Sequence, residues 1–415
     1  MWAVGNGGGE MSDDGLMPSD QDRTGRSFDR TELEFLGEVI ESGTLFGPKG
    51  KFVKRLVTDF SRWNGNAFAV ACSSGTAAIH AALSALDIGP GDEVITTGIT
   101  DIGALTPILY QGGIPVFCDV DATSGNVTKT AIEARITERT RAIIVTHLLG
   151  NPADVTAIVK LADRRGIPVL EDCAQAYGAT IGDVKVGRFG TIGAFSLQQG
   201  KHITSGEGGL IVTDHAELAR HMRLYVNKAW DYDAPSDHDF LALNYRMTEL
   251  EAAVATAQLA GIDQNLDTRR VNAFQLNDQL TEVPGVSFTS KVDGASPSYW
   301  RVGLIIDPSI VPGGTDALAD RLRSIGVPAA SRYIRKPAFQ TPLFTQQKTL
   351  GDSRWPFTLA TDDALDYSVD RYPGTFEFLS RVLVVPWNEK LTTGHVSRIA
   401  DAIVESVDQL TKDAA

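Results

Sequence analysis

Three short segments of the sequence place polar or reactive residues just after an apolar run. The first is SGT (74–76), where a helix that begins after a strand would aim its backbone N–H groups and its positive end at one point. Such a point suits a phosphate group. The second is Asp172, at an expected strand end, and ligands of open α/β sheets bind at that edge. The third is Lys201, five residues after Ser196, with glycines nearby that would let a ligand approach closely.

Each feature also has an ordinary structural explanation. Thr76 could simply cap a helix, and Asp172 could cap the segment that follows it. A lone loop lysine is usually solvated. Two nucleotide-binding alternatives fail on spacing: the GK at 200–201 lacks the upstream glycine of a Walker loop, and no Gly-x-Gly-x-x-Gly follows an apolar run.

Taken together, the three segments meet the needs of one chemistry. Pyridoxal phosphate (PLP) needs a phosphate anchor, a carboxylate that keeps its pyridine nitrogen protonated, and a lysine that forms a Schiff base. The protonated ring then accepts the electrons of a carbanion at the substrate Cα. The sequence supplies these groups in order, on what should be successive strand–helix units.

The elements that must position these residues alternate along the chain. Helix-like segments at 27–42 and 50–64 come first, and short β-rich runs then alternate with helix-length segments. This alternation predicts a mostly parallel sheet, and the continuous apolar runs predict that both of its faces are covered. The expected strands are 67–72, 93–97, 114–120, 141–148, 168–174, 192–197 and 208–214, and the helices between them are 76–86, 105–113, 130–136 and 155–166.

The second half of the chain has a different pattern. A long helical stretch at 248–283 precedes shorter mixed segments, which include strands at 298–307 and 381–387 and helices at 316–326 and 395–410. We expect a disordered or extended arm over residues 1–26, a large α/β domain over 27–265 and a smaller α+β domain over 266–415. The arm lacks the basic and apolar regions of a signal peptide.

Composition narrows the class of protein. The 415 residues carry a net charge of −14, which argues against nucleic acid as a partner. Apolar runs are too short to span a membrane. Cys72, Cys118 and Cys173 are scattered and form neither a disulfide framework nor a metal-ligand pattern, so we expect buried thiols and a cytoplasmic protein.

The sequence resembles the DegT/DnrJ/EryC1/StrS family of PLP-dependent sugar aminotransferases of fold type I. The resemblance extends from about Gly43 to the last helix. It rests on SSGTAAIHAAL (73–83), GDEVITT (91–97), PVFCDVD (115–121), THLLGNPAD (146–154), EDCAQAYGA (171–179), FSLQQGKHITSGEGG (195–209) and NYRMTELEAA (244–253). It implies a large domain with a mostly parallel sheet flanked by helices, and a smaller C-terminal α+β domain.

The resemblance also assigns roles at the ring of the cofactor. It implies that Lys201 forms the Schiff base and later moves the proton between Cα and the cofactor. It makes Asp172 the partner of the pyridine nitrogen and Gln175 a contact of the ring hydroxyl. Related sugar dehydratases carry histidine at the lysine position or recruit an iron–sulfur cluster. Here His202 is offset by one position, so transamination is favoured.

Further contacts are implied at the phosphate. Gly75, Thr76 and Ser196 match phosphate contacts within one chain. Asn244 matches an asparagine that reaches the phosphate from the neighbouring subunit, which implies a homodimer with shared active sites. Arg246 lies beside it and is a candidate for substrate binding.

One position departs from the family pattern. Members usually place an aromatic residue after the strand at 93–97, where it stacks on the cofactor ring, and this sequence has Asp101 there. Three explanations stay open: Asp101 faces the ring, the alignment slips by a residue or two, or Asp101 merely caps the next helix.

The segment SRYIRKPAF (331–339) falls where the family lines its substrate channel. Arg332, Tyr333 and Lys336 are therefore substrate-binding candidates, although a solvated basic turn is the more ordinary explanation of the charges. His147 ends an expected strand and could reach the site or serve only in packing.

The leading hypothesis is an aminotransferase that moves an amino group from glutamate or glutamine to a keto-sugar or keto-cyclitol, through pyridoxamine phosphate. Nucleotide-linked keto-sugars, free cyclitol ketones and keto-sugar acids all fit this reading. The alternatives are PLP-dependent dehydration or epimerisation of a sugar, and a sensor of PLP or sugar on a retired enzyme fold.

Overall fold

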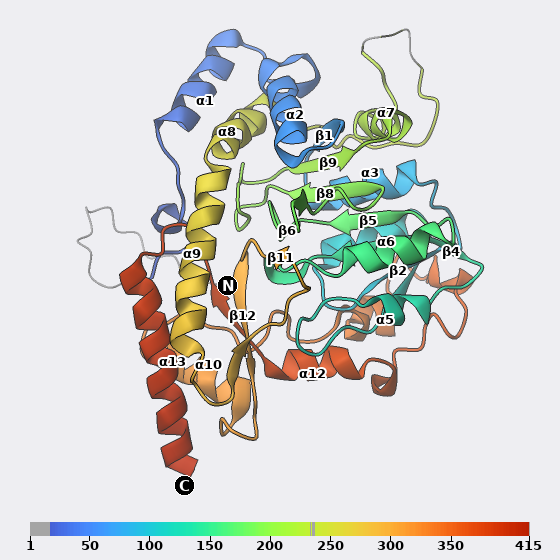
Figure 1. The fold of residues 1–415 in the computed structure, drawn as a ribbon. Helices are drawn as coiled ribbons and strands as arrows, with labels where there is room; N and C mark the ends of the chain where they lie inside the picture. The colour runs from blue at the N-terminus through green and yellow to red at the C-terminus, as the bar shows by residue number, and fades with distance from the viewer. Residues whose placement is uncertain (1–16, 233, 235–236, 415) are drawn as a thin grey trace.

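The computed structural model describes residues 17–232, 234 and 237–414. Its central element is a seven-stranded sheet with the order β1-β9-β8-β5-β4-β2-β3 (Figure 1). Its strand pairs are parallel except β1–β9 and β8–β9. Every strand coincides with a predicted one. They are β1 (Phe68–Cys72), β2 (Glu93–Thr97), β3 (Ile114–Cys118), β4 (Thr140–Thr146), β5 (Val169–Asp172), β8 (Ile192–Ser196) and β9 (Gly209–Thr213).

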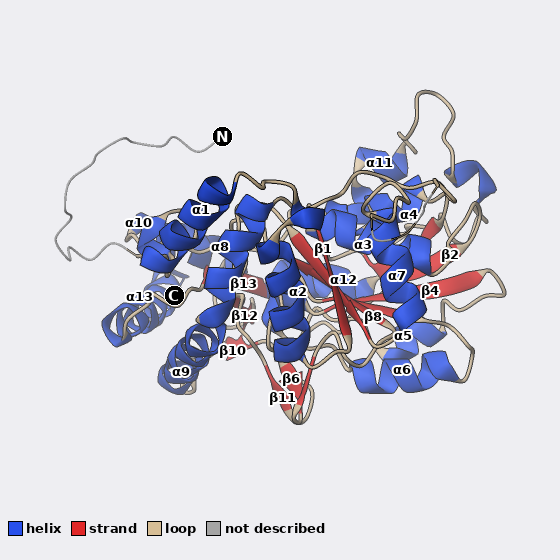
Figure 2. Ribbon diagram, turned by 90° about the horizontal axis from the view of Figure 1, so that it is seen from above, coloured by secondary structure: helices blue, strands red, loops and turns tan. Residues whose placement is uncertain are grey.

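Helices pack on both faces of this sheet, as the continuous apolar runs predict (Figure 2). On β9, Ile211 packs with α3, α4 and α7, whereas Leu210 and Val212 pack on the opposite face with α2 and α8. Helices α5 and α6 cover the β2–β5 part of that opposite face. These helices are α2 (Lys51–Asn64), α3 (Gly75–Ala85), α4 (Thr106–Tyr110), α5 (Lys129–Glu133), α6 (Val155–Asp163), α7 (Ala216–Tyr225) and α8 (Glu249–Ala260).

A second unit is built on the antiparallel sheet β10-β12-β13. Its apolar core joins these strands to α9, α10 and α13. The elements are α9 (Ile262–Leu280), β10 (Val286–Phe288), β12 (Arg301–Ile306), α10 (Gly314–Ser324), β13 (Val382–Pro386) and α13 (Thr393–Ala414). A small sheet of β6 (Thr180–Ile181), β7 (Val184–Lys185) and β11 (Ala295–Ser296) links the two units.

The long helical stretch predicted at 248–283 is two helices. Thr248 and Glu251 form a capping box at the start of α8, and the helix ends at Gly261, which separates it from α9. Glycine is the weakest helix former apart from proline, so the break falls where the chain resists helix formation least. The helical stretch predicted at 248–283 is thus confirmed over residues 249–280, with a break at Gly261.

After residue 266, part of the chain packs with the second unit and part returns to the large sheet. The predicted boundary between residues 265 and 266 falls inside α9. Farther on, Phe339, Phe344 and Phe357 pack against Phe117 of the large sheet. This stretch includes α11 (Pro342–Thr345), and α12 (Pro373–Arg381) follows it. The division of the chain at residue 266 stays a prediction.

The N-terminal part of the prediction concerns residues 1–26, of which 1–16 lie outside the described residues. Within residues 17–26, Asp20 and Arg26 are buried. Helix α1 (Arg30–Ser42) follows after a capping box at Asp29.

All three cysteines are free and buried, as predicted. Burial raises the pKa of Cys72 and Cys118 to about 12, so both thiols stay protonated at neutral pH. Among the helices that the structure describes, none combines the length and apolar character that crossing a membrane requires.

Candidate active site

A cavity of about 200 Å³ lies at the carboxyl ends of β5 and β8, beside the start of α3. The sheet order explains this position, because β5 and β8 are parallel neighbours and β9 connects β8 to β1, which leads into α3. The cavity brings together six residues singled out in the sequence: Gly75, Thr76, Asp101, Asp172, Ser196 and Lys201.

The start of α3 forms one wall of the cavity. Ser74, and not Thr76, caps this helix, because its side chain accepts a hydrogen bond from the N–H of Ala77. Gly75 and Ser196 approach so closely that a Cβ on Gly75 would lie 2.8 Å from the Cβ of Ser196. The helix N-terminus, the hydroxyl of Thr76 and Ser196 thus line one polar part of the cavity, here called the cradle, and a helix N-terminus suits a phosphate group.

We expect the Gly75→Ala variant to bind PLP roughly 10- to 100-fold more weakly, because the added methyl group must push Ser196 away from the cradle. Equilibrium dialysis against PLP measures this change. The control is Gly37→Ala, since a Cβ on Gly37 meets no atom within 4 Å. Unchanged PLP affinity in Gly75→Ala would place the phosphate elsewhere.

Asp172 ends β5 and is only 5% exposed. Burial raises its pKa, while the N–H of Ala174, which donates to its Oδ1 over 3.1 Å, and the charge of Lys201 lower it. A buried carboxylate of this kind requires a cationic partner. A protonated pyridine nitrogen is such a partner.

Lys201 lies in the loop between β8 and β9. A tight turn holds its backbone: its N–H donates to the carbonyl of Gln198 over 2.9 Å, and the N–H of Gly200 donates to the side chain of Gln198 over 2.8 Å. Burial lowers the pKa of Lys201, while Asp172 and Asp101 raise it. A lowered pKa increases the fraction of neutral amine, which is the nucleophilic form.

Trp300 is a site residue that the sequence reasoning missed. The Nζ of Lys201 lies 4.5 Å from the centroid of the Trp300 ring, and the indole N–H donates to the carbonyl of Gly200 over 2.6 Å. In the sequence, Trp300 belongs only to a strand-like run, and its place beside Lys201 depends on the packing of the second unit against the sheet. The aromatic ring limits where the amine can move.

Gln175 and Tyr333 meet beside the cavity. The side-chain N–H of Gln175 donates to the hydroxyl of Tyr333 over 3.0 Å, and its Oε1 accepts from the N–H of Leu149 over 2.7 Å. Burial raises the pKa of Tyr333, so its hydroxyl remains protonated at neutral pH and can still donate.

Asp101 fits two of the three explanations left open by the sequence. Its Oδ1 accepts from the N–H of Gly103 over 2.7 Å and caps the short 3₁₀ helix Ile102–Ala104. It also lines the cavity with Lys201 and Asp172. The carboxylate therefore both caps this turn and faces the cavity, and its match to the family's aromatic position stays a prediction.

Comparison with known proteins decides the family. The family model described as the DegT/DnrJ/EryC1/StrS aminotransferase family matches residues 27–404. The chain belongs to this family. It is therefore an aminotransferase, and its large domain has the fold-type-I arrangement expected from the sequence.

Relatives and a solved structure agree with this assignment. The aminotransferase is 38% identical over 336 residues to an L-glutamine:2-deoxy-scyllo-inosose aminotransferase of Streptomyces fradiae, covering 76% of this chain and 79% of that protein. It is 33% identical over 281 residues to a GDP-perosamine synthase of Vibrio cholerae, covering 68% and 76%. Its structure matches that of an aminotransferase from Psychrobacter cryohalolentis with a TM-score of 0.82 and 29% identity, covering 93% and 98%.

Asn244 and Arg246 of the aminotransferase do not line the cavity that holds Lys201. Asn244 is exposed. Arg246 lines a separate cavity of about 280 Å³, where it donates to the side chain of Asn227 over 3.0 Å and lies 5.2 Å from the ring of Phe46. Within one chain, the structure therefore keeps these two residues apart from the others.

Two of the three candidates in segment 331–339 also point elsewhere. Arg332 pairs with Asp316 of α10 over 2.8 Å, and Lys336 donates to the carbonyl of Gln340 over 2.8 Å. Both side chains contact the second unit or their own turn, whereas Tyr333 reaches Gln175.

The two histidines near the site are engaged in packing contacts. His147 lies 3.0 Å from the carboxylate of Glu171, and its Nδ1 accepts from the N–H of Ala153 over 3.1 Å. The Nε2 of His202 lies 3.1 Å from the carbonyl of Ser298, and burial lowers its pKa well below the usual range. Neither lines the cavity with Lys201.

Proposed function

We propose that the protein is a PLP-dependent aminotransferase that moves an amino group from glutamate or glutamine to the ketone of a sugar or cyclitol. The observation that carries the proposal is that Lys201, Asp172 and the cradle at the start of α3 line one cavity. Family membership supports the reaction class. Relatives named as aminotransferases of a cyclitol ketone and of a UDP-linked keto-sugar support the acceptor class.

The residues fit PLP at three points. Gly75, Thr76 and Ser196 would hold its phosphate, Asp172 its pyridine nitrogen, and Lys201 its aldehyde carbon. When bound, the cofactor supplies an electron sink for the carbanion at Cα. Two observations support this placement: Gly75, Thr76 and Ser196 line the same cavity at the start of α3, and the buried Asp172 carboxylate would be stabilised in its charged form by a cation beside it.

The chain contributes proton transfer and exclusion of water. Lys201, once released from the cofactor, would accept the proton from the substrate carbon and return it to another atom, and its lowered pKa increases the fraction of neutral amine that can accept this proton. Trp300 would keep the amine over the reacting face, and Tyr333, held by Gln175, would close the side of the cavity.

The donor half-reaction tests the proposed function. The protein is loaded with PLP, mixed with excess glutamate or glutamine, and assayed for 2-oxo acid and for the visible absorbance of the bound cofactor. We expect about one 2-oxo acid per active site before any ketone is added, as ping-pong kinetics require. A ketone acceptor consumed without any amino donor would instead indicate dehydration or epimerisation.

We also propose a homodimer with shared active sites, in a cytoplasmic location. Asn244 supports the dimer because it is exposed and does not line the cavity that holds Lys201 in the same chain. The resemblance places this residue at the phosphate bound by the neighbouring subunit. Leu241 is 92% exposed and Leu243 40%, and exposed apolar groups beside a polar contact favour an interface. The free buried thiols support a reducing compartment.

Mixed dimers test the shared site. We expect Lys201→Ala and Asn244→Ala to be nearly inactive alone, and a co-expressed, equal mixture to recover about a quarter of wild-type activity. Recovery follows because each mixed dimer then contains one site with both natural residues. Mixing Lys201→Ala with Asp172→Asn is the control, since these residues share one chain's cavity and should give no recovery. An inactive first mixture would contradict shared sites.

A further inference from the structure

Residues 17–26 precede the part of the chain that matches the family, yet they contact the active-site loop. The carbonyl of Pro18 accepts from Asn388 over 2.8 Å, after β13 of the second unit. The carbonyl of Asp20 accepts from Gln199 over 3.1 Å, two residues before Lys201. The segment therefore joins the second unit to the loop that carries the reactive lysine.

The segment is folded into a closed turn before it reaches this loop. The N–H of Gly25 donates to the carbonyl of Ser19 over 2.9 Å, and the hydroxyl of Thr24 accepts from the N–H of Ser19 over 2.9 Å. A Cβ on Gly25 would lie 2.4 Å from the carbonyl carbon of Ser19, so the turn closes only with glycine there. This turn presents Asp20 and Arg26 to the same side.

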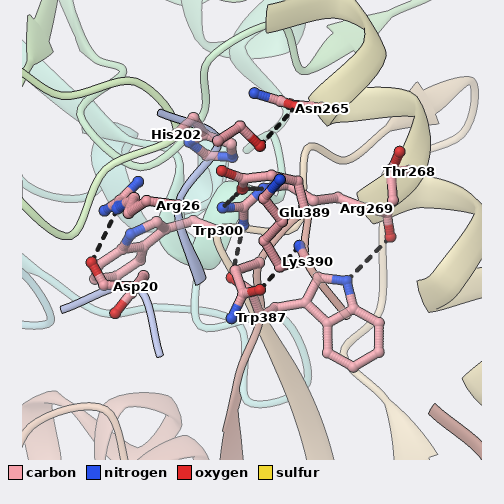
Figure 3. A network of polar contacts seen from close by, with 12 residues as sticks. Asp20, Arg26, His202, Asn265, Thr268, Arg269, Trp300, Trp387, Glu389 and Lys390 are labelled. Atoms are coloured by element: carbon pink, nitrogen blue, oxygen red, sulfur yellow. Dashed lines mark hydrogen bonds and ion pairs between the residues drawn. The ribbon is translucent and has the colours of Figure 1, made fainter. Parts of the chain in front are cut away.

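Arg26 binds the backbone of the reactive residue itself. Arg26 is 2% exposed, and its guanidinium donates to the carbonyl of Lys201 over 2.5 Å. It also donates to the carbonyl of Asp20 over 2.9 Å (Figure 3). Burial lowers the pKa of Arg26, while Glu389 and Asp20 raise it. A buried cation is unfavourable unless it is well partnered, so its place beside this carbonyl needs an explanation beyond stability.

Two consecutive carbonyls of the lysine loop are thus held by side chains from distant segments. Trp300 binds the carbonyl of Gly200, and Arg26 binds the carbonyl of Lys201. The orientation of this peptide sets where the Lys201 side chain starts. A displacement near 1 Å can lower a reaction rate by about 100-fold.

Asp20 acts on the charge around the amine. It pairs with Arg301 over 2.5 Å, and the guanidinium of Arg301 lies 4.6 Å from the Trp300 ring that Lys201 also contacts. The charged groups that face Lys201 are Asp172 of β5, Asp101 before the 3₁₀ helix, Arg301 of β12 and Asp20. Among the described residues, Asp20 is the carboxylate that pairs with Arg301, so its loss would leave this guanidinium without that compensating charge.

We propose that residues 17–26 are a positioning element of the active site, in which Arg26 orients Lys201 through its backbone and Asp20 neutralises Arg301 beside it. The proposal rests on the proposed function for the role of Lys201. It assigns a catalytic contribution to a segment outside the matched family region, through residues that touch neither substrate nor cofactor.

The test uses full-length protein loaded with PLP and the variants Arg26→Gln and Arg26→Lys. For Arg26→Gln we expect the donor half-reaction to slow by about 100-fold with the donor KM changed by less than about threefold. We also expect weaker circular dichroism of the bound cofactor, because its orientation is less fixed. Arg26→Lys should recover part of both signals, since an ammonium can still donate to one carbonyl. The control is Arg23→Gln, an exposed arginine of the same segment, which should leave both unchanged.

Asp20→Asn keeps the test decisive if Arg26→Gln does not fold. We expect the pH at which the visible band of the bound cofactor changes to fall by about one unit, because an unpaired Arg301 disfavours a nearby cation. The proposal is overturned if Arg26→Gln lowers only the thermal midpoint while the rate, the circular dichroism and the KM stay at wild-type values. It is also overturned if Asp20→Asn leaves the pH of the change in the visible band unaltered.

A wild-type protein without a donor half-reaction would refute the proposed function. The circular dichroism and the pH of the change in the visible band would still decide the present proposal.

Discussion

Replacing Lys201 by alanine should lower the rate of amino transfer by a factor on the order of 10⁴ and leave the fold intact. Two functions are lost together, because the same amine holds the cofactor and moves the proton. The structure makes no substitute available within the cavity, since Lys201 is the only lysine among the described residues that line it. Steady-state rates with saturating donor and acceptor, together with the visible spectrum of PLP-loaded protein, measure both losses.

Lys185→Ala is the matched control for this variant. The ammonium of Lys185 lies 3.8 Å from the ring centroid of Trp63 and donates to the Trp63 carbonyl over 2.5 Å, so it resembles Lys201 in its contact with an aromatic ring. It lies outside the cavity and should keep wild-type activity. If Lys201→Ala retained more than about a hundredth of the wild-type rate, the assignment of the reactive lysine would be wrong.

Asp172→Asn should lower the rate by roughly 10³-fold, because a neutral amide cannot keep the pyridine nitrogen protonated. The shape of the side chain and its hydrogen bond from Ala174 would persist. Substrate binding at the ketone should therefore change little. Rates in single turnover and the KM for each substrate separate these effects.

The same variant should be more stable than wild type when the cofactor is absent. Burial raises the folded pKa of Asp172, so the folded state holds its proton more tightly than the unfolded chain. This carboxyl therefore destabilises the fold progressively as the pH rises from about 4, the unfolded pKa, through the raised folded pKa. At neutral pH an uncharged asparagine removes that penalty, and the thermal midpoint of PLP-free protein should rise.

Asp119→Asn is the control, because we expect it to lower the stability and keep the rate, whereas Asp172→Asn should raise the stability and lower the rate. Asp119 also follows a strand of the sheet, but its carboxylate accepts from the N–H groups of Gly374 and Thr375 at the start of α12. Loss of its charge should destabilise the protein by about 1 kcal/mol and leave the rate unchanged. A lower midpoint in PLP-free Asp172→Asn would show that its charge is already compensated within the chain.

Much of the architecture can be read from the sequence, because the signal is local. The strands of the large sheet carry consecutive apolar residues rather than strict alternation, and burial on both faces favours that pattern. The break of the long helix at Gly261 was missed, since a single glycine is tolerated in many helices. The sequence also did not predict that Phe339 and Phe344 pack on the large sheet, because the pattern of a loop does not indicate which residues its aromatic side chains contact.

The candidate site divides in the same way. The sequence by itself determined that Asp172, Ser196 and Lys201 stand at strand ends or in the loop after them, and parallel strands bring such ends to one edge. Only the tertiary structure decided that Trp300 and Arg26 hold the lysine loop and that Tyr333 meets Gln175. The physical reason is the separation of the contacting residues along the chain. Strand ends follow from the pattern of neighbouring residues, whereas contacts between residues 100 or more positions apart depend on how separate units pack.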